Sequence, residues 1–167
     1  MVIWITGYPG AGKTTVGTAL YKMLKKERND VVLLDGDKMR WAIGEEQDYS
    51  LEGREKMAMK YARLCHVLSS QGLIVICCTV SMFERVWQWN RRHITDYFEI
   101  YLRVSFDVLR KRDKKHLYSG FESGLVKHVV GMDLPVIEPR EPHLVLDGSG
   151  TTSISTCVKE IIAACGL

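Results

Sequence analysis

The residues best suited to chemistry lie near the start of the chain, in the segment 7–14, which reads GYPGAGKT. Its spacing is that of a phosphate-binding loop, G-x-x-x-x-G-K-[ST], in which backbone N–H groups and the following helix attract phosphate. We expect Lys13 to neutralise β- and γ-phosphate oxygens and the Thr14 hydroxyl to bind Mg²⁺. The motif therefore predicts ATP and Mg²⁺ as cofactors. The residues of this segment expected to bind ATP are Gly7, Gly10, Ala11, Gly12, Lys13, Thr14 and Thr15.

Phosphate loops occur in kinases, GTPases and mechanical ATPases, so the loop alone leaves the reaction class open. The sequence contains no N-K-x-D motif, with which a GTPase reads its base. Its 167 residues are also too few for motor or transporter machinery. A small-molecule kinase is therefore favoured.

Two carboxylates, Asp35 and Asp37, follow the second predicted strand, and Arg40 stands one helical turn further on. Carboxylates beside a phosphate loop could steer Mg²⁺ or accept the proton of an acceptor hydroxyl. Because phosphoryl transfer needs mainly positioning and charge neutralisation, the base is a modest contributor. For Asp35 a capping role and a metal-binding role both stay open. Asp37 is expected to be catalytic, together with Lys13.

The elements that must position these residues alternate between strands and helices. Apolar runs predict strands at 2–6, 31–34, 73–80, 98–104 and 144–146. Helical spacing predicts helices at 13–26, 52–71, 83–92, 106–112 and from 154 to 162. This alternation implies an α/β fold, a P-loop NTPase-type doubly wound parallel sheet of about five strands. In such sheets ligands bind at the carboxyl ends of the strands, where the phosphate loop, the two carboxylates and Ser81 all lie.

The alternating pattern stops between residues 113 and 142, a stretch that holds three glycines, three prolines and scattered charges. So long a stretch without regular structure inside a compact domain is usually a functional lid or a disordered loop. We expect a lid at 113–142 within a single kinase domain that spans residues 1–167.

The bulk composition excludes several other classes of protein. A net charge of +3 is too small to indicate nucleic-acid binding, and no apolar run approaches the 18 residues of a membrane span. The N-terminus has no basic region followed by a cleavage site. The five cysteines lack C-x-x-C spacing, and Cys65, Cys77 and Cys78 lie in apolar runs, as buried thiols do in a reducing compartment. A cytoplasmic protein is expected.

Beyond the phosphate loop, the sequence resembles the adenylylsulfate kinase (APS kinase) family over residues 1–158. The segment LDGD at 34–37 with Arg40 matches the family's L-D-G-D-x-x-R, and YSLEGR at 49–54 matches its aromatic-Ser-x-x-D-R except at the Asp. Residues 112–139 match its lid, which runs from R-D-x-K-G-L-Y to G-I-D-x-P. The resemblance implies transfer of the γ-phosphate of ATP to the 3′-hydroxyl of a nucleotide that bears a mixed anhydride.

The resemblance also implies roles for single residues. Asp37 would be the base for the acceptor hydroxyl, and Arg40 and Arg54 would clamp the acceptor phosphate, since a planar guanidinium binds phosphate oxygens in pairs. Lys115 and His128 would approach the acceptor when the lid closes. For His128 the alternative of an exposed lid residue without a role stays open. The residues implied for the acceptor are Asp37, Arg40, Tyr49, Arg54, Met57, Val80, Ser81, Lys115, His128 and Val129. Those implied at the ATP base are Arg112 and Thr152.

Several acceptor-side positions depart from the family pattern. Met57 replaces an Asn, and Val129 replaces the aromatic residue that would sandwich the acceptor base against Tyr49. Trp87, in a tryptophan-rich segment, stands where the family has an arginine. The ATP side keeps its pattern. A changed acceptor would explain why the departures are confined to the acceptor side. In this respect the sequence resembles APS-kinase-like enzymes of surface-polysaccharide pathways, such as cytidine diphosphoramidate kinases.

Three functions therefore stay open. The default acceptor is adenylyl sulfate (APS), and a cytidine diphosphoramidate-type acceptor is the second. The third function, a non-catalytic nucleotide-binding regulator, gives no reason for Asp37, Arg40 and Arg54 to accompany the phosphate loop. In each kinase reading the partner is a small-molecule nucleotide, without nucleic acid or membrane, and a homodimer stays open.

Overall fold

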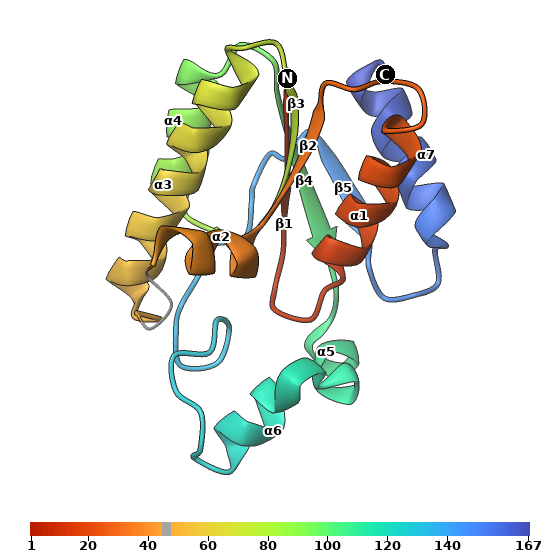
Figure 1. Cartoon of the computed structure of the whole chain (residues 1–167). Helices are drawn as coiled ribbons and strands as arrows, with labels where there is room; N and C mark the ends of the chain where they lie inside the picture. The colour runs from red at the N-terminus through yellow and green to blue at the C-terminus, as the bar shows by residue number, and fades with distance from the viewer. Residues whose placement is uncertain (45–47) are drawn as a thin grey trace.

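The computed structural model describes residues 1–44 and 48–167 (Figure 1). Its centre is one sheet of five parallel strands in the order β2-β3-β1-β4-β5. The strands are β1 Val2–Thr6, β2 Val31–Asp35, β3 Ile74–Cys78, β4 Tyr97–Arg103 and β5 Leu144–Asp147. The sequence-based expectation of a doubly wound parallel sheet is confirmed.

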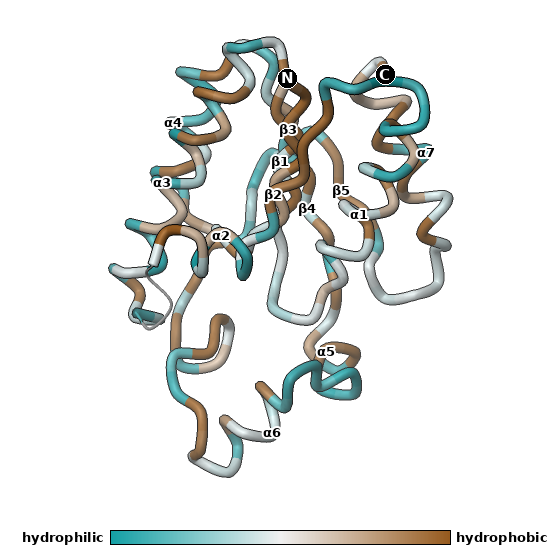
Figure 2. Tube along the Cα trace, in the orientation of Figure 1, coloured by the Kyte–Doolittle hydropathy of each residue, from teal (hydrophilic) through white to brown (hydrophobic). Residues whose placement is uncertain are grey.

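Helices cover both faces of this sheet, which explains why the central strands are apolar throughout. They are α1 Lys13–Leu24, α2 Gly36–Ile43, α3 Leu51–Ser69, α4 Glu84–His93, α5 Phe106–Arg112, α6 Leu117–Glu122 and α7 Ile154–Cys165. In Figure 1, α1 and α7 lie on one face, and α3 and α4 lie on the other. All residues of β1 and of β3 are buried, as expected for parallel strands between two layers of helices. In Figure 2 these strands are brown, between helices of mixed colour.

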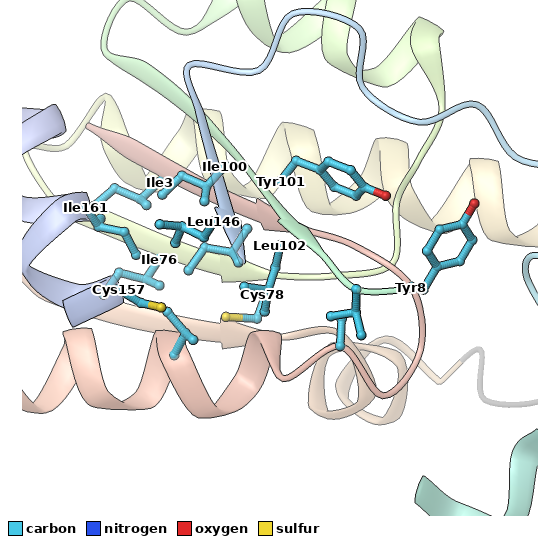
Figure 3. Close-up of a cluster of buried hydrophobic side chains, with 14 of the residues drawn as sticks. Ile3, Tyr8, Ile76, Cys78, Ile100, Tyr101, Leu102, Leu146, Cys157 and Ile161 are labelled. Atoms are coloured by element: carbon cyan, nitrogen blue, oxygen red, sulfur yellow. The ribbon is translucent and has the colours of Figure 1, made fainter. Parts of the chain in front are cut away.

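Side chains alternate along β1 and contribute to two hydrophobic cores, one on each face of the sheet. Ile3 and Ile5 belong to the core beneath α1 and α7, which Figure 3 shows reaching from Ile161 to Tyr8 at the phosphate loop. Val2 and Trp4 point to the other face and pack with α3 and α4. The phosphate loop is thus continuous with a packed core on the side of α1.

Helix α2 is an element that the periodicity of the sequence did not reveal. It has eight residues and begins at Gly36, directly after β2. The Asp35 carboxylate starts it by accepting hydrogen bonds from the N–H groups of Asp37 (3.2 Å) and Lys38 (3.3 Å). Gly44 ends it with φ of 77°, a left-handed conformation that glycine adopts without strain. The capping role for Asp35 is therefore present.

The expectation that residues 113–142 lack regular structure is wrong in part. The stretch contains α6 and a 3₁₀ helix, η1, at Lys114–His116. Both are too short for helical periodicity to show in the sequence. Buried side chains also tie the stretch to the core: Tyr118, Val129, Val130 and Leu134. In Figure 1 the part of the stretch around α6 lies beyond the carboxyl ends of the strands, where a lid would be, and the chain then runs back along the sheet to β5.

The cysteines are all free, and Cys65, Cys77 and Cys78 are buried as expected. Burial raises the pKa of Cys78 to about 12, so this thiol is protonated at neutral pH. Over the described ranges, 1–44 and 48–167, no helix has the length and apolar character to cross a membrane.

Candidate active site

The phosphate loop lies between β1 and α1 and depends on glycine at three positions. Gly7, Gly10 and Gly12 have φ angles of 152°, 80° and 103°. A Cβ at Gly7 would lie 2.6 Å from the Leu102 carbonyl oxygen on β4, so only glycine fits there. The loop therefore has the strand–turn–helix context that makes the motif a phosphate site.

Lys13 lies folded back along this loop. Its Nζ donates hydrogen bonds to the carbonyl oxygens of Gly7 (2.9 Å) and Tyr8 (2.8 Å). Burial lowers the pKa of Lys13 to about 8, although nearby negative charge, including that of Asp37, acts to raise it. The positive charge of Lys114 acts in the lowering direction. The ammonium group is thus desolvated and close to the position that phosphate oxygens would take.

Thr14 and Asp35 bring two oxygen atoms together at the start of α1. The Thr14 hydroxyl donates a hydrogen bond of 2.6 Å to Oδ2 of Asp35, whose Oδ1 caps α2. A hydroxyl and a carboxylate beside a phosphate loop are hard oxygen ligands of the kind that Mg²⁺ prefers. No cluster of three or more His, Cys, Asp or Glu side chains suited to a metal occurs among the described residues. The donor set thus fits a Mg²⁺ that takes its remaining ligands from phosphates and water.

The larger of two neighbouring cavities opens on the α1–α7 side of the loop and has a volume of about 580 Å³. It is lined by phosphate-loop residues, by the start of α7 and by the loop after β5. Arg112 and Thr152 are on its wall, and Arg112 Nη1 lies 3.5 Å from the Ala11 carbonyl oxygen. The two residues that the sequence assigned to the ATP base therefore border the same space as Ala11, Gly12 and Thr15.

The second cavity, of about 340 Å³, lies on the opposite side of the phosphate loop, beneath the segment 113–142 that was expected to be a lid. Lys13, Thr14, Asp35 and Asp37 line it from the sheet side, and Lys115 lines it from the lid. The Lys115 ammonium donates to Oδ2 of Asp37 at 2.6 Å, and this hydrogen bond raises the pKa of Lys115. The expected base thus lies in a space shared with the phosphate-binding residues.

Tyr49 lies close to both arginines that are expected to clamp phosphate. The guanidinium carbons of Arg40 and Arg54 are 4.6 Å and 5.1 Å from the centroid of its ring. Arg40 Nη1 also donates to the Asp48 carbonyl (2.9 Å), and Arg54 Nε donates to the Tyr49 carbonyl (3.0 Å). Burial lowers the pKa of Arg54, and the charge of Arg40 adds to this effect. The Tyr49 ring, which was expected to stack on an acceptor base, thus makes cation–π contacts with two arginines.

The segment 113–142, the expected lid, contacts the site through backbone and side-chain groups. Arg54 Nη2 donates to the His128 carbonyl oxygen at 2.9 Å, and the N–H groups of His128 and Val129 donate to the Asp133 carboxylate (2.7 and 2.6 Å). His128 therefore contributes a carbonyl to this network, and its residue is exposed. On the other side of the lid, the Tyr118 hydroxyl donates to the Pro9 carbonyl at 2.8 Å.

The positions that depart from the family pattern are separated by the structure. Val129 lines the 340 Å³ cavity with Tyr49. Met57 and Ser81 instead line a smaller adjoining chamber of about 70 Å³, and Met57 is only 1% exposed and packs in the core beneath α3 and α4. Met57 is therefore a core residue at the edge of the site, whereas the resemblance implied a residue that contacts the acceptor. Val80 lines both spaces.

Several lining residues were missed by the sequence reasoning. Thr79 was placed inside a strand, but β3 ends at Cys78, and the Thr79 hydroxyl pairs with that of Ser81 at 2.7 Å. Trp87 Nε1 donates to the Ser81 carbonyl at 3.1 Å and so holds this turn in place. Asp147 ends β5 beside the larger cavity, where the rule that ligands bind at strand ends could have found it. Lys114 lines both cavities.

Comparison with known proteins agrees with this geometry. The family described as adenylylsulphate kinase matches residues 1–147. A cytidine diphosphoramidate kinase of Campylobacter jejuni is 38% identical over 161 residues, which are 96% of this chain and 94% of that protein. A probable adenylyl-sulfate kinase of Aeropyrum pernix is 35% identical over 91% of this chain and 85% of its own length.

Solved structures give the same result. The Mycobacterium tuberculosis APS kinase, in complex with AMPPNP and APS, has a TM-score of 0.89 and 25% identity, and the match covers 99% of this chain and 97% of that one. The family match, the two kinase relatives and the shared fold together identify the chain as a member of the adenylylsulphate kinase family, an ATP-utilising phosphotransferase of nucleotides.

Proposed function

We propose that this enzyme transfers the γ-phosphoryl group of ATP, with Mg²⁺, to the 3′-hydroxyl of a nucleotide acceptor. One observation carries the proposal: Lys13 and Thr14 line the same 340 Å³ cavity as Asp37 and Lys115. A phosphoryl donor held by the loop and a hydroxyl held at Asp37 would meet in that space. A non-catalytic ATP-binding regulator would have no use for this shared cavity.

Each residue has a defined part in this reaction. The acceptor oxygen attacks the γ-phosphorus, the bond to the β–γ bridging oxygen breaks, and Asp37 takes the hydroxyl proton after Lys115 has left its carboxylate. Lys13 neutralises the phosphate oxygens at the loop. Thr14 and Asp35 would hold Mg²⁺, which supplies charge neutralisation on the β- and γ-phosphates when it is bound.

Two acceptors are candidates. Adenylyl sulfate is the default, because the A. pernix relative is named a probable adenylyl-sulfate kinase and the M. tuberculosis structure contains APS. Cytidine diphosphoramidate is the second, and the site favours it at one position. Val129 offers no second aromatic face opposite Tyr49, and a base–aromatic stack is worth about 1–3 kcal/mol. A purine loses more by that absence than a smaller pyrimidine held on one ring.

A coupled assay of ADP release tests the proposal. Purified enzyme with Mg²⁺–ATP is supplied with adenylyl sulfate, with cytidine diphosphoramidate or with no acceptor, and Lys13→Ala serves as the inactive control. We expect acceptor-dependent ADP release with a 3′-phosphorylated product. ADP release that neither acceptor raises above the rate with ATP alone would reject the function.

The remaining parts of the proposal concern the setting of the enzyme. Substrates of this size need neither nucleic acid nor a membrane, and the free thiols suit a reducing, cytoplasmic setting. A homodimer stays open, and gel filtration with light scattering would determine it.

A further inference from the structure

Lys114 has a position that no other lid residue shares among those the structure describes. Four residues line both the ATP-side cavity and the acceptor-side cavity: Gly10, Gly12, Thr15 and Lys114. The first three belong to the phosphate loop and its helix, so Lys114 is the member of the four that comes from across the site. The γ-phosphoryl group of ATP, held by the phosphate loop, would enter the acceptor-side cavity at this boundary.

The backbone on both sides of Lys114 is fixed to the site. Asp113 has a left-handed φ of 32°, and its carboxylate accepts from the Tyr118 N–H at 2.9 Å. Tyr118 in turn bonds to Pro9 of the phosphate loop, and Lys115 bonds to Asp37. Asp113 is therefore held to the phosphate loop through Tyr118, and Lys115 is held to Asp37 until an acceptor displaces it. The Lys114 side chain extends from between these two residues.

The charge of Lys114 reaches the reaction space as well. Its electrostatic influence is felt at Lys13, the ammonium group inside the loop. The two cations come from opposite sides, one from the loop and one from the lid. In phosphoryl transfer, a cation supplied from outside the phosphate loop neutralises charge on the equatorial oxygens of the group in flight. The APS kinase lid motif R-D-x-K-G-L-Y leaves this position unspecified, so the resemblance assigns Lys114 no role.

We propose that Lys114 is a catalytic residue whose ammonium group binds the phosphoryl group as it passes from ATP to the acceptor. The inference rests on the proposed phosphoryl transfer, and it assigns to the lid a second cation besides Lys115. Lys115 bonds to the acceptor-side carboxylate, whereas Lys114 faces the donor as well. Closing the lid would thus complete the charge around the transferred group, and an open lid would leave ATP bound but slow to react.

The test uses three variants of the full chain: Lys114→Met, Lys114→Arg and the control Lys111→Met. Lys111 is an exposed residue of α5 in the same basic run, and it is on the wall of neither cavity. Binding of Mg²⁺–ADP is measured with and without aluminium fluoride, which mimics the phosphoryl group in flight and needs no acceptor. Single-turnover transfer to the two candidate acceptors is measured in parallel.

We expect Lys114→Met to leave the affinity for ADP alone unchanged and to abolish most of the gain from aluminium fluoride. Transfer should slow about 10²–10³-fold, the usual effect of losing one preorganised donor to the transition state. Lys114→Arg should keep most of the gain in affinity from aluminium fluoride and most of the transfer rate. Lys111→Met should behave as the parent. The proposal would be overturned if aluminium fluoride did not raise the affinity of the parent for Mg²⁺–ADP. It would also be overturned if aluminium fluoride raised the affinity of Lys114→Met as much as that of the parent. A parent inactive with both acceptors would reject the proposed function, while the aluminium fluoride result still decides the role of Lys114.

Discussion

At the scale of single residues, the charged groups of the site form hydrogen bonds within the free protein. Substrate atoms would take the place of these partners when they bind. Lys13 bonds to two loop carbonyls, and Lys115 bonds to Asp37. The Asp37–Lys115 pair is well exposed, with side-chain exposures of 71% and 66%. Exposed pairs contribute about 0–1 kcal/mol, so an acceptor hydroxyl can displace this one at little cost.

Replacing Lys13 by Ala should abolish most of the transfer activity. The side chain neutralises charge on the phosphates, and loss of one such contact costs about 3–4 kcal/mol, or 10²–10³ in kcat. The measurement is the rate of ADP release at saturating substrates, with circular dichroism to confirm the fold. Activity of the folded variant within about tenfold of the parent would remove Lys13 from the mechanism.

The lowered pKa of Lys13 predicts a pH dependence with a defined sign. The free enzyme loses this proton near pH 8, so kcat/KM for ATP, which reports the free enzyme, should fall above that pH. Bound phosphates favour the charged amine, so kcat should hold to higher pH. Because the pKa of Lys13 in the folded chain is below the ordinary lysine value of 10.5, the unfolded chain binds more protons between about pH 8 and 10.5. This lysine therefore makes stability rise with pH over that window.

Rate profiles from pH 6.5 to 10 and chemical denaturation over the same range measure these effects. Lys13→Arg is the matched variant, because arginine stays protonated and should remove the break near pH 8. A parent profile for kcat/KM that is flat to pH 10 would show that Lys13 keeps its proton in the free enzyme.

At the scale of elements, α1 carries the phosphate loop and is held against β3 by a close contact at Gly17. A Cβ at this position would lie 2.2 Å from Sγ of Cys78, with Ile76 and Leu33 atoms at 3.5 Å. The same Cys78 thiol donates to the Lys13 carbonyl at 3.4 Å. The Cys78 side chain thus contacts α1 at Gly17 and also holds Lys13, the first residue of the helix.

Gly17→Ala should therefore destabilise the protein by about 1–3 kcal/mol through overpacking, despite the better helix propensity of alanine. Cys78→Ala removes the clashing sulfur, so the double variant should be more stable than the sum of the two single effects. Urea denaturation of the four proteins measures the coupling. Strict additivity would show that α1 has room to shift away from β3.

The elements also show what the sequence could and could not predict. The strands gave apolar runs and most helices gave one apolar face, so the five strands and the helices α1, α3, α4, α5 and α7 could be predicted to within a few residues. Helix α2 and the lid helices are short and are stabilised by caps and docking, as at Asp35 and Asp113, and these leave little periodicity. The phosphate loop is local in sequence, whereas the Arg54–His128 contact joins residues 74 positions apart.

The lid should be the element most changed by substrates. Lys127 is exposed, and the three contacts that close the lid come from Lys115, Tyr118 and the His128 carbonyl. We expect trypsin to cut at Lys127 in the free protein and to be slowed when ATP and acceptor are both bound. Tyr118→Phe, which loses the bond to Pro9, should be cut faster. Equal rates in all states would contradict a substrate-ordered lid.

At the scale of the whole molecule, donor and acceptor are handled by different parts of the chain that meet at the phosphate loop. The ATP-side cavity draws on α1, α7 and the loop after β5, whereas the acceptor-side spaces draw on α2, α3, the turn after β3 and the lid. The departures from the family pattern fall in the second group. A family fold can therefore change its acceptor while the donor half stays as it is.

This division predicts that acceptor preference can be shifted by Val129→Phe combined with Met57→Asn. Phenylalanine would restore an aromatic face toward Tyr49, worth about 1–3 kcal/mol for a stacked base. Asparagine would add a hydrogen bond of about 1 kcal/mol. Both parent side chains are 1% exposed, so the changes also cost stability, and Asn at position 57 places an amide at the edge of a core.

The measurement is therefore the ratio of kcat/KM for adenylyl sulfate to that for cytidine diphosphoramidate, because a loss of folded enzyme cancels in a ratio. The double variant should raise this ratio at least about tenfold, at the low end of the stacking and hydrogen-bond energies combined. Val67→Phe is the control, since Val67 is an exposed α3 residue that lines neither acceptor space. If the parent already prefers adenylyl sulfate and the double variant leaves the ratio unchanged, the chain is an adenylyl-sulfate kinase with an unusual acceptor wall. A shifted ratio would instead place acceptor choice at these two positions, where the sequence first departs from its family.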